Sequence, residues 1–306
     1  MMAGVILVIN SWLLLGCSND QKSESDAPNQ VEVENENVEK SDDEVELDDF
    51  EADIDTFIEE VTKVNQELES FSIESIIDTT QTFDGEKDHS ITTQEQDTIF
   101  EPFQYRKYMV TEQQDDSDYD EGELNDEEIT IYNVDGINYV NFKGSFGDGK
   151  QWVKSENEYS DDEMRDVETV NVKKILENLS DITIEKSLTE EDDLYILSFD
   201  INLEKLAELD KENSQFLQSE DEEATQKLKD TYEVKQMDYQ MKFDKESKYL
   251  LELESSRKFS YEMDFNDKTD TMETEEKTVI IYKDHNQVDE IVLPEEVLEN
   301  AKEPTE

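Results

Sequence analysis

The feature that most constrains this chain is a two-residue alternation of large apolar and polar side chains. Successive side chains of a β-strand point to opposite faces of a sheet, so this alternation indicates a strand with one buried face. It recurs in many segments, and its two clearest rows lie in "DLYILSFDIN" and "KFSYEMDF". The rows are Tyr195, Leu197, Phe199 and Ile201, and Phe259, Tyr261, Met263 and Phe265. We expect all of them to face the covered side of one sheet.

Helical spacing separates these blocks of strands. Apolar residues recur at three- and four-residue intervals from Phe50 to Leu68, and again at about 161–179 and 203–230. Between two β-rich runs, "NVDG" at 133–136 is typical of a tight hairpin turn. Tight turns between strands, without a regular strand–helix rhythm, predict an α+β fold in which helices pack on one face of an antiparallel sheet.

The N-terminal segment has the pattern of an export signal. "VILVINSWLLLG", residues 5–16, is apolar but shorter than the about 20 residues that a membrane-spanning helix needs. Its length suits the hydrophobic region of a signal peptide, although "MMAGV" lacks the Lys or Arg that usually precedes one. The following Leu14-Leu15-Gly16-Cys17 resembles the bacterial lipobox. That resemblance implies removal of residues 1–16 and attachment of a diacylglyceryl group to Cys17, the only cysteine.

An anchor on Cys17 implies that the protein is held on the outer face of the cell membrane, toward the cell wall. Residues 17–49 contain no aromatic side chain and many Asp and Glu. Such a segment cannot bury enough apolar surface to fold, so we expect an acidic flexible tether. The folded domain is then expected to span residues 50–306.

The charge of the chain restricts its partners. The chain has 85 Asp and Glu against 27 Lys and Arg, a net charge of −58. A surface this acidic repels phosphate backbones, which excludes nucleic acid, and no polybasic cluster is present to dock on anionic lipid headgroups. Such an acidic excess is typical of proteins that face high external salt, where counterions screen the repulsion. An ordinary acidic secreted protein is the alternative.

Two adjacent segments carry a family resemblance. "EITIYNVDGINYVNFKG" and "GDGKQWVKSE" combine a strand Tyr, an Asp-Gly turn, a second Tyr and a Trp-x-Lys run. The residues concerned are Tyr132, Asp135, Gly136, Tyr139, Trp152, Val153 and Lys154. Together with "DLYILSFDINLEKLAEL" and "MDYQMKFDKESKYLLELES", this order of motifs resembles a group of uncharacterised Gram-positive lipoproteins. The resemblance implies a half-barrel of the lipoprotein-carrier (LolA/LppX) type, a strongly curved antiparallel sheet with helices packed on its concave face.

The same resemblance implies a function. Proteins of this fold enclose an apolar cavity, so the domain is expected to bind a hydrophobic small molecule or lipid, with the two alternating rows as candidates for the cavity lining. The alternative is a non-catalytic envelope interaction module that presents its acidic, salt-adapted surface to a protein partner. A cavity between sheet and helices would favour the first function, and a filled core with an exposed apolar patch would favour the second.

A glycine-rich segment has the spacing of a phosphate-binding loop but not its other features. "GSFGDGKQ" supplies Gly144, Gly149 and Lys150 at that spacing. Gln151 stands where such a loop has Ser or Thr, and "QWVKSE" then alternates like a strand, whereas a phosphate-binding loop opens a helix. We therefore expect a hairpin turn here and no nucleotide cofactor.

An acidic segment has nearly the ligand spacing of a calcium-binding EF-hand loop. "DDSDYDEGELNDEE" contains Asp116, Asp118, Asp120 and Glu127 at suitable intervals. The glycine that such a loop requires comes one residue late, at Gly122, and no helical patterns flank the segment. We expect a solvated acidic loop without a resident metal, and weak Ca²⁺ binding is the alternative.

Candidates for catalysis are few. Only His89 and His285 are available as bases near neutral pH, and neither lies near a nucleophile motif. Pairs of carboxylates occur by chance in a chain this acidic, so they do not indicate an active site. We therefore expect a binding protein without catalytic residues or cofactors.

Overall fold

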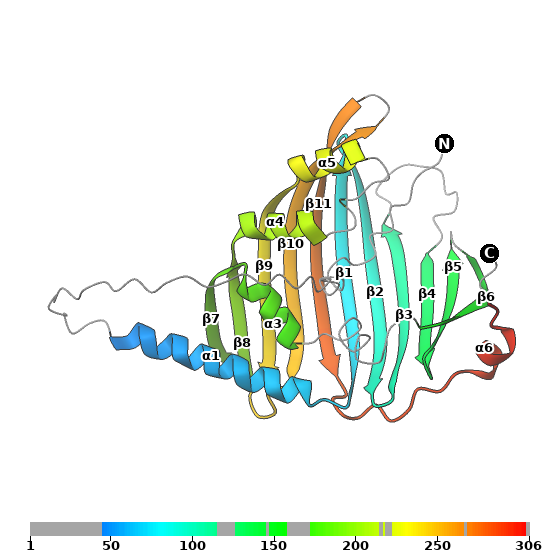
Figure 1. Ribbon diagram of the computed structural model, residues 1–306, viewed down its shortest axis with the longest axis horizontal. Helices are drawn as coiled ribbons and strands as arrows, with labels where there is room; N and C mark the ends of the chain where they lie inside the picture. Colours follow the sequence, from blue (N-terminus) through cyan, green and yellow to red (C-terminus); the bar gives the residue numbers. More distant parts are fainter. Residues whose placement is uncertain are drawn as a thin grey trace, which may run out of the picture.

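The fold is built on one large antiparallel sheet. The computed structural model describes residues 45–114, 126–144, 147–157, 172–213, 217, 222–265 and 268–303. The sheet has 11 strands in the spatial order β6-β5-β4-β3-β2-β1-β11-β10-β9-β8-β7 (Figure 1). It is open and curved, with helices on its concave side. The predicted α+β class and half-barrel architecture are therefore confirmed.

The strands and helices have the following bounds. The strands are β1 (Ser70–Phe83), β2 (Glu86–Phe100), β3 (Phe103–Gln114), β4 (Glu127–Val134), β5 (Ile137–Gly144), β6 (Gly147–Glu156), β7 (Thr183–Glu191), β8 (Leu194–Ile201), β9 (Glu233–Asp244), β10 (Leu250–Phe265) and β11 (Lys268–Lys283). The helices are α1 (Val45–Gln66), α3 (Val172–Ser180), α4 (Leu203–Asn213), α5 (Glu222–Thr231) and α6 (Glu295–Asn300).

The sheet consists of two meanders joined along one long strand pair. Within β1–β6 and within β7–β11 each strand pairs with its neighbour in sequence, and β1 pairs with β11 at the centre. In that pair Ile73 lies opposite Tyr282, from the other end of the chain. The strands β6 and β7 become the two edges of the sheet. Pairing of β1 with β11 therefore decides that the two meanders share one concave face.

Tight turns join successive strands, as the sequence predicts. Asp135 and Gly136, between β4 and β5, both have positive φ values, 54° and 73°. Positive φ at both central residues defines the type I′ hairpin turn, which Asn-Gly and Asp-Gly pairs favour. The hairpin predicted from "NVDG" is therefore confirmed. Gly147 begins β6, so the segment after the glycine-rich run is a strand, as expected.

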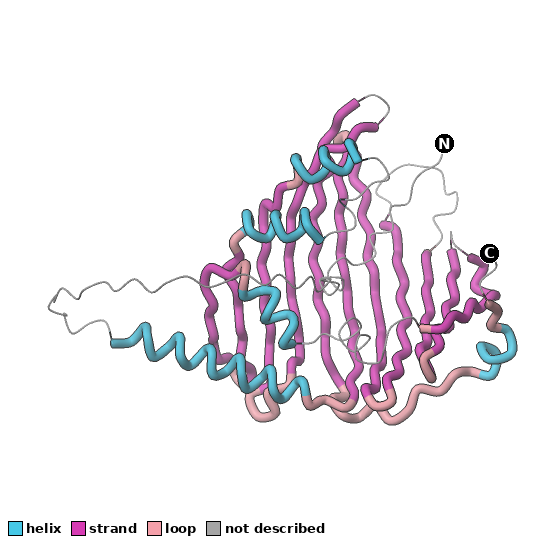
Figure 2. Tube along the Cα trace, viewed as in Figure 1, coloured by secondary structure: helices cyan, strands magenta, loops and turns pink. Residues whose placement is uncertain are grey.

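Four of the helices cover the β7–β11 half of the concave side (Figures 1 and 2). On α1, Ile54, Phe57 and Val61 are buried at helical spacing, and the Phe57 ring meets the Phe243 ring edge-on at 5.5 Å. The helix α1 already begins at Val45, and the pattern at 203–230 corresponds to two helices, α4 and α5. The pattern at 161–179 corresponds to α3, and residues 161–171 lie outside the described ranges.

The C-terminal segment protects one edge of the sheet. Beyond β11 the chain passes to α6, beside β6 (Figure 1). The Lys302 amide donates to the Trp152 carbonyl at 3.0 Å, and the Lys154 amide donates to the Lys302 carbonyl at 2.9 Å. An edge strand exposes unpaired backbone groups that attract other chains. This short parallel bridge occupies part of that edge.

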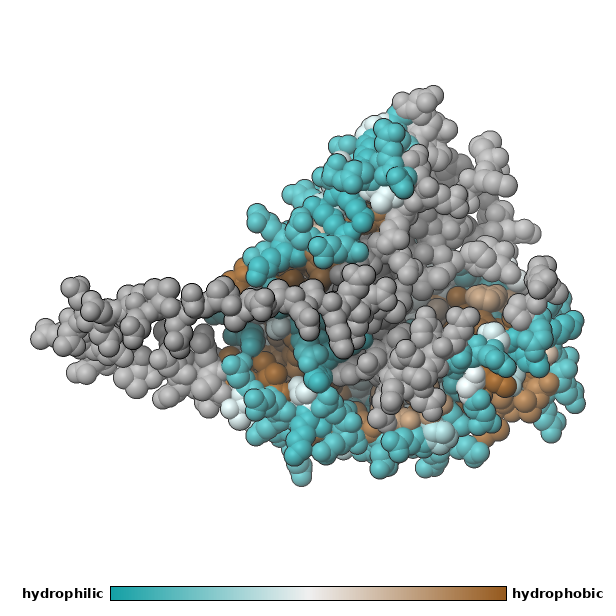
Figure 3. Space-filling model, viewed as in Figure 1, coloured by the Kyte–Doolittle hydropathy of each residue, from teal (hydrophilic) through white to brown (hydrophobic). Residues whose placement is uncertain are grey.

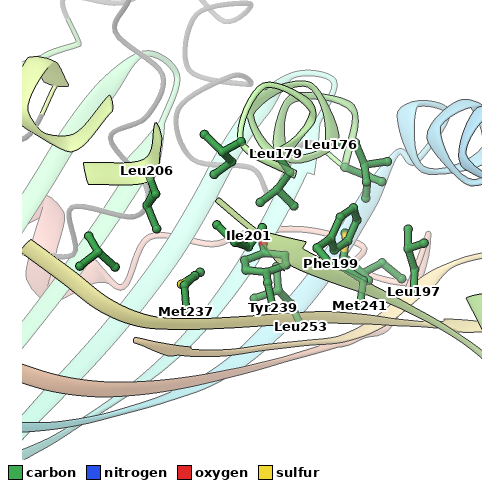
Figure 4. Close-up of a cluster of buried hydrophobic side chains, with 14 of the residues drawn as sticks. Leu176, Leu179, Leu197, Phe199, Ile201, Leu206, Met237, Tyr239, Met241 and Leu253 are labelled. Carbon is green, nitrogen blue, oxygen red and sulfur yellow. The ribbon is translucent and has the colours of Figure 1, made fainter. Parts of the chain in front are cut away.

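The main core lies between the covering helices and the β7–β11 half. Leu176 and Leu179 of α3 point down toward Phe199 and Tyr239 on the strands (Figure 4). The core continues across β11 to Phe71 and other residues of β1. Removal of this apolar surface from water stabilises the fold by about 25 cal/mol for each Å² buried. The core therefore fixes the helices on one side of the sheet.

Candidate ligand-binding face

The concave face can be traced from strand to strand through the register. Residues directly opposite each other on antiparallel strands point to the same side of the sheet. Ile73 belongs to the core under the helices, and it pairs with Tyr282 on one side and Gln96 on the other. Gln96 in turn pairs with Lys107. The concave face therefore continues from the apolar core onto β2 and β3.

The two alternating rows lie where the sequence predicts. On β8, Leu197, Phe199 and Ile201 are buried in the core, and on β10 Tyr261 is buried in the same core. Three further members, Tyr195, Phe259 and Met263, are partly buried and pack against that core. The side chain of Phe265 lies outside the described part of the molecule. Their position on the helix-covered side is confirmed for the described members, and their contact with a ligand stays a prediction.

The row on β8 is packed against its neighbours. The Phe199 ring contacts the Tyr239 ring at 6.0 Å in an edge-on arrangement. Tyr195 lies 5.0 Å from the Phe57 ring of α1, between centroids, and the Lys248 ammonium lies 4.0 Å from the centroid of the Tyr195 ring. A cation over an aromatic face at this distance is attracted by the ring quadrupole. This end of the row is thus capped by a basic turn residue.

A buried polar cluster interrupts the row on β10. Arg257, two residues before Phe259, faces the same side and donates to the Asp210 carboxylate of α4 and to the Tyr232 hydroxyl. The Tyr232 hydroxyl also donates to the Asp210 carboxylate, at 2.8 Å. The Arg257 guanidinium lies 4.9 Å from the centroid of the Phe259 ring. These contacts tie α4 to the sheet.

The electrostatics of this cluster are dominated by burial. Burial raises the pKa of the Asp210 carboxyl above its usual range, although the charge of Arg257 and the hydrogen bonds act in the opposite direction. Burial likewise raises the pKa of the Tyr232 phenol. At Asp210, burial away from water therefore disfavours the charged carboxylate more than its partners favour it. The cluster is therefore suited to position α4 and has no free base to offer for catalysis.

A second group of buried polar side chains lies on β1–β4, and we call it the polar strip. Its members are Ser75, Gln94, Gln96, Thr98, Lys107 and Asn133, each at most 7% exposed. The Gln94 amide donates to the Gln96 side-chain oxygen at 3.2 Å, and the Gln96 amide donates to the Thr98 hydroxyl at 3.0 Å. A ladder of hydrogen bonds therefore runs along the concave side of β2.

Reasoning from the sequence missed the polar strip and the Arg257 cluster. The signal for the strip is "QEQDT" at 94–98, where amides and a hydroxyl alternate with carboxylates. The signal for Arg257 is its two-residue spacing from Phe259. Both signals are weak because a row of apolar residues, and not of polar ones, marks a buried face.

Other predicted sites lie partly outside the described residues. Cys17 and residues 115–125 of the acidic loop fall outside them, so the anchor and the calcium alternative stay predictions. Within the described ranges, no three His, Cys, Asp or Glu side chains gather where they could hold a metal ion. In the same part of the chain, no helix combines the length and apolar character that a membrane span requires. His89 is exposed and bonded to Asp78 at 2.9 Å.

The covering helices have a hydrophilic outer surface above apolar side chains. The outward faces of α4 and α5 are hydrophilic, and apolar side chains show below them (Figure 3). None of the described side chains of α5 is buried. The helices therefore act as an amphipathic cover on the apolar half of the concave face.

Comparison with known proteins assigns a family. The profile of a family of unknown function, DUF6612, matches residues 53–302. No curated protein matches the chain. Among solved structures, a DUF1329 family protein from Desulfovibrio piger aligns at 11% identity over 76% of this chain and 91% of that chain, with a TM-score of 0.23. Because the family match extends from within α1 to beyond α6, the chain belongs to the DUF6612 family of unknown function.

Proposed function

We propose that this protein is an extracytoplasmic lipoprotein, anchored in the cell membrane through Cys17, and that its half-barrel binds an apolar molecule such as a lipid. The observation that carries the proposal is that the described helices cover only part of the concave face. The helices α1, α3, α4 and α5 lie over β7–β11, and among the described elements no helix lies over β2–β4 (Figure 1). The concave face of those strands nevertheless holds buried side chains.

The composition of the face supports a ligand that is mainly apolar. The face combines the core rows of β8–β11 with Phe103, Tyr105 and Ile131 on β3 and β4. A binding site lined mostly by apolar and aromatic side chains, with a few placed polar groups, is the usual arrangement for a small hydrophobic molecule. Carriage on the outer face of a membrane needs no catalytic group, so the proposed role is binding without chemistry.

The experiment that tests the proposal looks for the ligand itself. The full-length protein is extracted from membranes in detergent, exchanged into a volatile buffer, and analysed by native mass spectrometry. We expect an added mass that is released by organic solvent and identified as a lipid. The delipidated protein should then take up N-phenylnaphthylamine with an increase in fluorescence. Absence of both the added mass and the probe uptake would contradict ligand binding.

A second candidate function is an envelope interaction module. The observation in its favour is the dense packing of Leu197, Phe199 and Tyr239, which leaves the β8 row inside the core. In that case the acidic surface would contact a protein partner, and the concave face would be structural. The same fluorescence measurement separates the two functions, since a purely structural core takes up no apolar probe.

A further inference from the structure

Part of the concave face of β1–β4 lacks acidic side chains. The register places three rows of residues across these strands. The rows are Phe71–Thr98–Tyr105–Asn133, Ile73–Gln96–Lys107–Ile131 and Ser75–Gln94–Met109–Ile129. None of these positions holds Asp or Glu, in a chain that has 85 of them, and Lys107 is the single charged residue. The charge carried by these three rows is therefore positive.

The opposite face of the same strands carries the acids. Glu95 and Asp97 alternate with the amides of β2, and Glu74 lies opposite Glu95 on β1. Arg106, one residue before Lys107, forms an ion pair with Asp97 on that convex side. Within the three rows, alternation thus places the carboxylates on the convex face and leaves Lys107 on the concave face. Carboxylates return to the concave face only beyond the three rows, at Glu127, Asp88 and Glu86.

The polar strip is also too polar for a simple core. Burying amides, hydroxyls and an ammonium costs free energy unless each finds a partner, and apolar residues would fill the same space without that cost. Lys107 is 7% exposed and its ammonium lies 5.7 Å from the centroid of the Tyr105 ring. An ammonium has three donors, so it can bind an acceptor in addition to its partners within the protein. The positions therefore suit a bound acceptor.

A neighbouring hydroxyl points to the same conclusion. Tyr282 lies in the row of Lys107, separated from it by Ile73 and Gln96. Its side chain is 6% exposed, and within the described residues its hydroxyl has no hydrogen-bond partner. A buried hydroxyl without a partner is rare in native proteins and calls for an explanation, which a bound acceptor would supply.

We infer that the polar strip binds the anionic headgroup, a carboxylate or a phosphate, of a single amphiphile whose chain lies against the apolar rows of β8–β11. This inference rests on the proposed function and names its ligand class. Lys107 supplies the charge, Gln96 supplies amide donors, and the Tyr282 hydroxyl lies toward the apolar half. Charge-assisted hydrogen bonds are roughly twice as strong as neutral ones, so Lys107 is the residue that distinguishes an acid from a neutral amphiphile.

The test measures displacement of a bound fluorescent probe from the delipidated full-length protein. The competitors are palmitate, palmityl alcohol and phosphatidylglycerol, which present a carboxylate, a hydroxyl and a phosphodiester. We expect one of the two acids to bind about tenfold more tightly than the alcohol, the value of one charge-assisted hydrogen bond. The acid that binds more tightly identifies the headgroup. Equal affinity for acid and alcohol would overturn the inference.

Three variants assign the preference to Lys107. Lys107→Met removes the charge and keeps the apolar stem, so it should abolish the preference by lowering the affinity for the acid more than the affinity for the alcohol. Lys107→Arg should retain the preference. Arg106→Gln is the matched control, because it removes the same charge from the convex face of the same strand. A preference that survives in Lys107→Met would contradict the inference.

The outcomes separate this inference from the proposed function. A parent protein that takes up neither the probe nor any competitor contradicts both. A parent that binds the probe and all competitors equally supports an apolar carrier and contradicts the headgroup site. Circular dichroism would show whether Lys107→Met folds. If it does not, the affinities of the parent and of Lys107→Arg for acid and alcohol still decide whether the site prefers an anionic headgroup.

Discussion

Arg257 on β10 and Asp210 on α4 form a salt bridge in which the two side chains are only 5% and 6% exposed. The two residues are the contact that fixes α4 over the apolar half of the sheet. A pair this deeply buried has lost nearly all of its hydration, and that burial raises the pKa of Asp210 although Arg257 acts in the opposite direction. We therefore expect the salt bridge to fix the position of α4 and to add little net stability.

The first prediction concerns removal of one partner. Asp210→Ala leaves the Arg257 guanidinium buried without its carboxylate, and we expect a loss of about 3–5 kcal/mol in the free energy of unfolding, measured in urea. Replacement of the whole cluster by apolar residues, in Asp210→Leu, Tyr232→Phe and Arg257→Met together, should cost less than that single change. Lys211→Ala, which breaks an exposed 3.0 Å ion pair with Glu208 on the same helix, is the control and should cost less than about 1 kcal/mol. A triple variant less stable than Asp210→Ala would contradict this account.

The second prediction concerns pH. His285 stacks on Tyr249 with ring centroids 4.7 Å apart, and its Nε2 donates to the Leu250 carbonyl at 2.9 Å. Burial lowers the pKa of His285 below its usual 6.5, against the smaller effect of that hydrogen bond. Well above pH 6.5 the ring is neutral in both the folded and the unfolded state. As the pH falls through 6.5, the unfolded chain binds the proton first, so the free energy of unfolding falls until the folded ring is also protonated.

The expected loss is less than about 1 kcal/mol, because the ring is only partly buried and solvent screens its charge. Urea unfolding across this pH range should show a smaller loss in His285→Gln than in the parent, since Gln can donate to the same carbonyl and does not titrate. His89→Gln, at the exposed histidine, is the matched control and should retain the contribution of His285. An unchanged profile in His285→Gln would show that the acid sensitivity has another origin.

Local patterns were sufficient to predict the class of the fold. The rows on β8 and β10 follow from the two-residue alternation, and the β4–β5 hairpin follows from Asp135 and Gly136. The central pair of β1 with β11 could not be predicted in the same way, because Ile73 and Tyr282 lie at opposite ends of the domain and no local signal specifies their contact. Partners of that kind depend on the packing of the whole chain.

The candidate site shows the same division. Alternation predicts which side of a strand Phe199 and Tyr261 occupy, and it gives Arg257 the same side as Phe259. It does not reveal that Asp210 on a separate helix neutralises Arg257, or that Gln96 and Lys107 share a row. The polar strip was overlooked because burial was inferred from apolar residues alone. Its burial depends on neighbours that the sequence does not place.

The third prediction concerns the packing of the β8 row. Phe199 is 7% exposed and contacts Tyr239, so Phe199→Ala should open a cavity and cost about 3–5 kcal/mol. Ile184→Ala, at a 64% exposed position on β7, is the control and should cost less than about 1 kcal/mol. A nearly neutral Phe199→Ala variant that takes up more of an apolar probe would instead place a ligand beside this ring.

The fourth prediction concerns the anchor. If Cys17 carries the diacylglyceryl group, Cys17→Ser removes the sulfur to which it is attached, and two acyl chains are what makes such anchoring durable. We expect the variant to appear in the culture medium or to accumulate with its signal peptide uncleaved. Phase partitioning in a cloud-point detergent should move it from the detergent phase to the aqueous phase. A variant that partitions like the parent would exclude Cys17 as the anchor.

The last prediction concerns salt and calcium. A folded domain within a chain of net charge −58 holds its carboxylates closer together than the unfolded chain does, so screening by NaCl should raise the free energy of unfolding from low ionic strength upward.

If the acidic loop at 115–128 is solvated, CaCl₂ should stabilise no more than NaCl at equal ionic strength. If the loop binds Ca²⁺, the added stability should saturate with concentration, and Asp118→Asn should abolish it because it removes a ligand charge. Asp88→Asn, at an exposed carboxylate of β2 outside the loop, is the matched control and should leave any such effect unchanged.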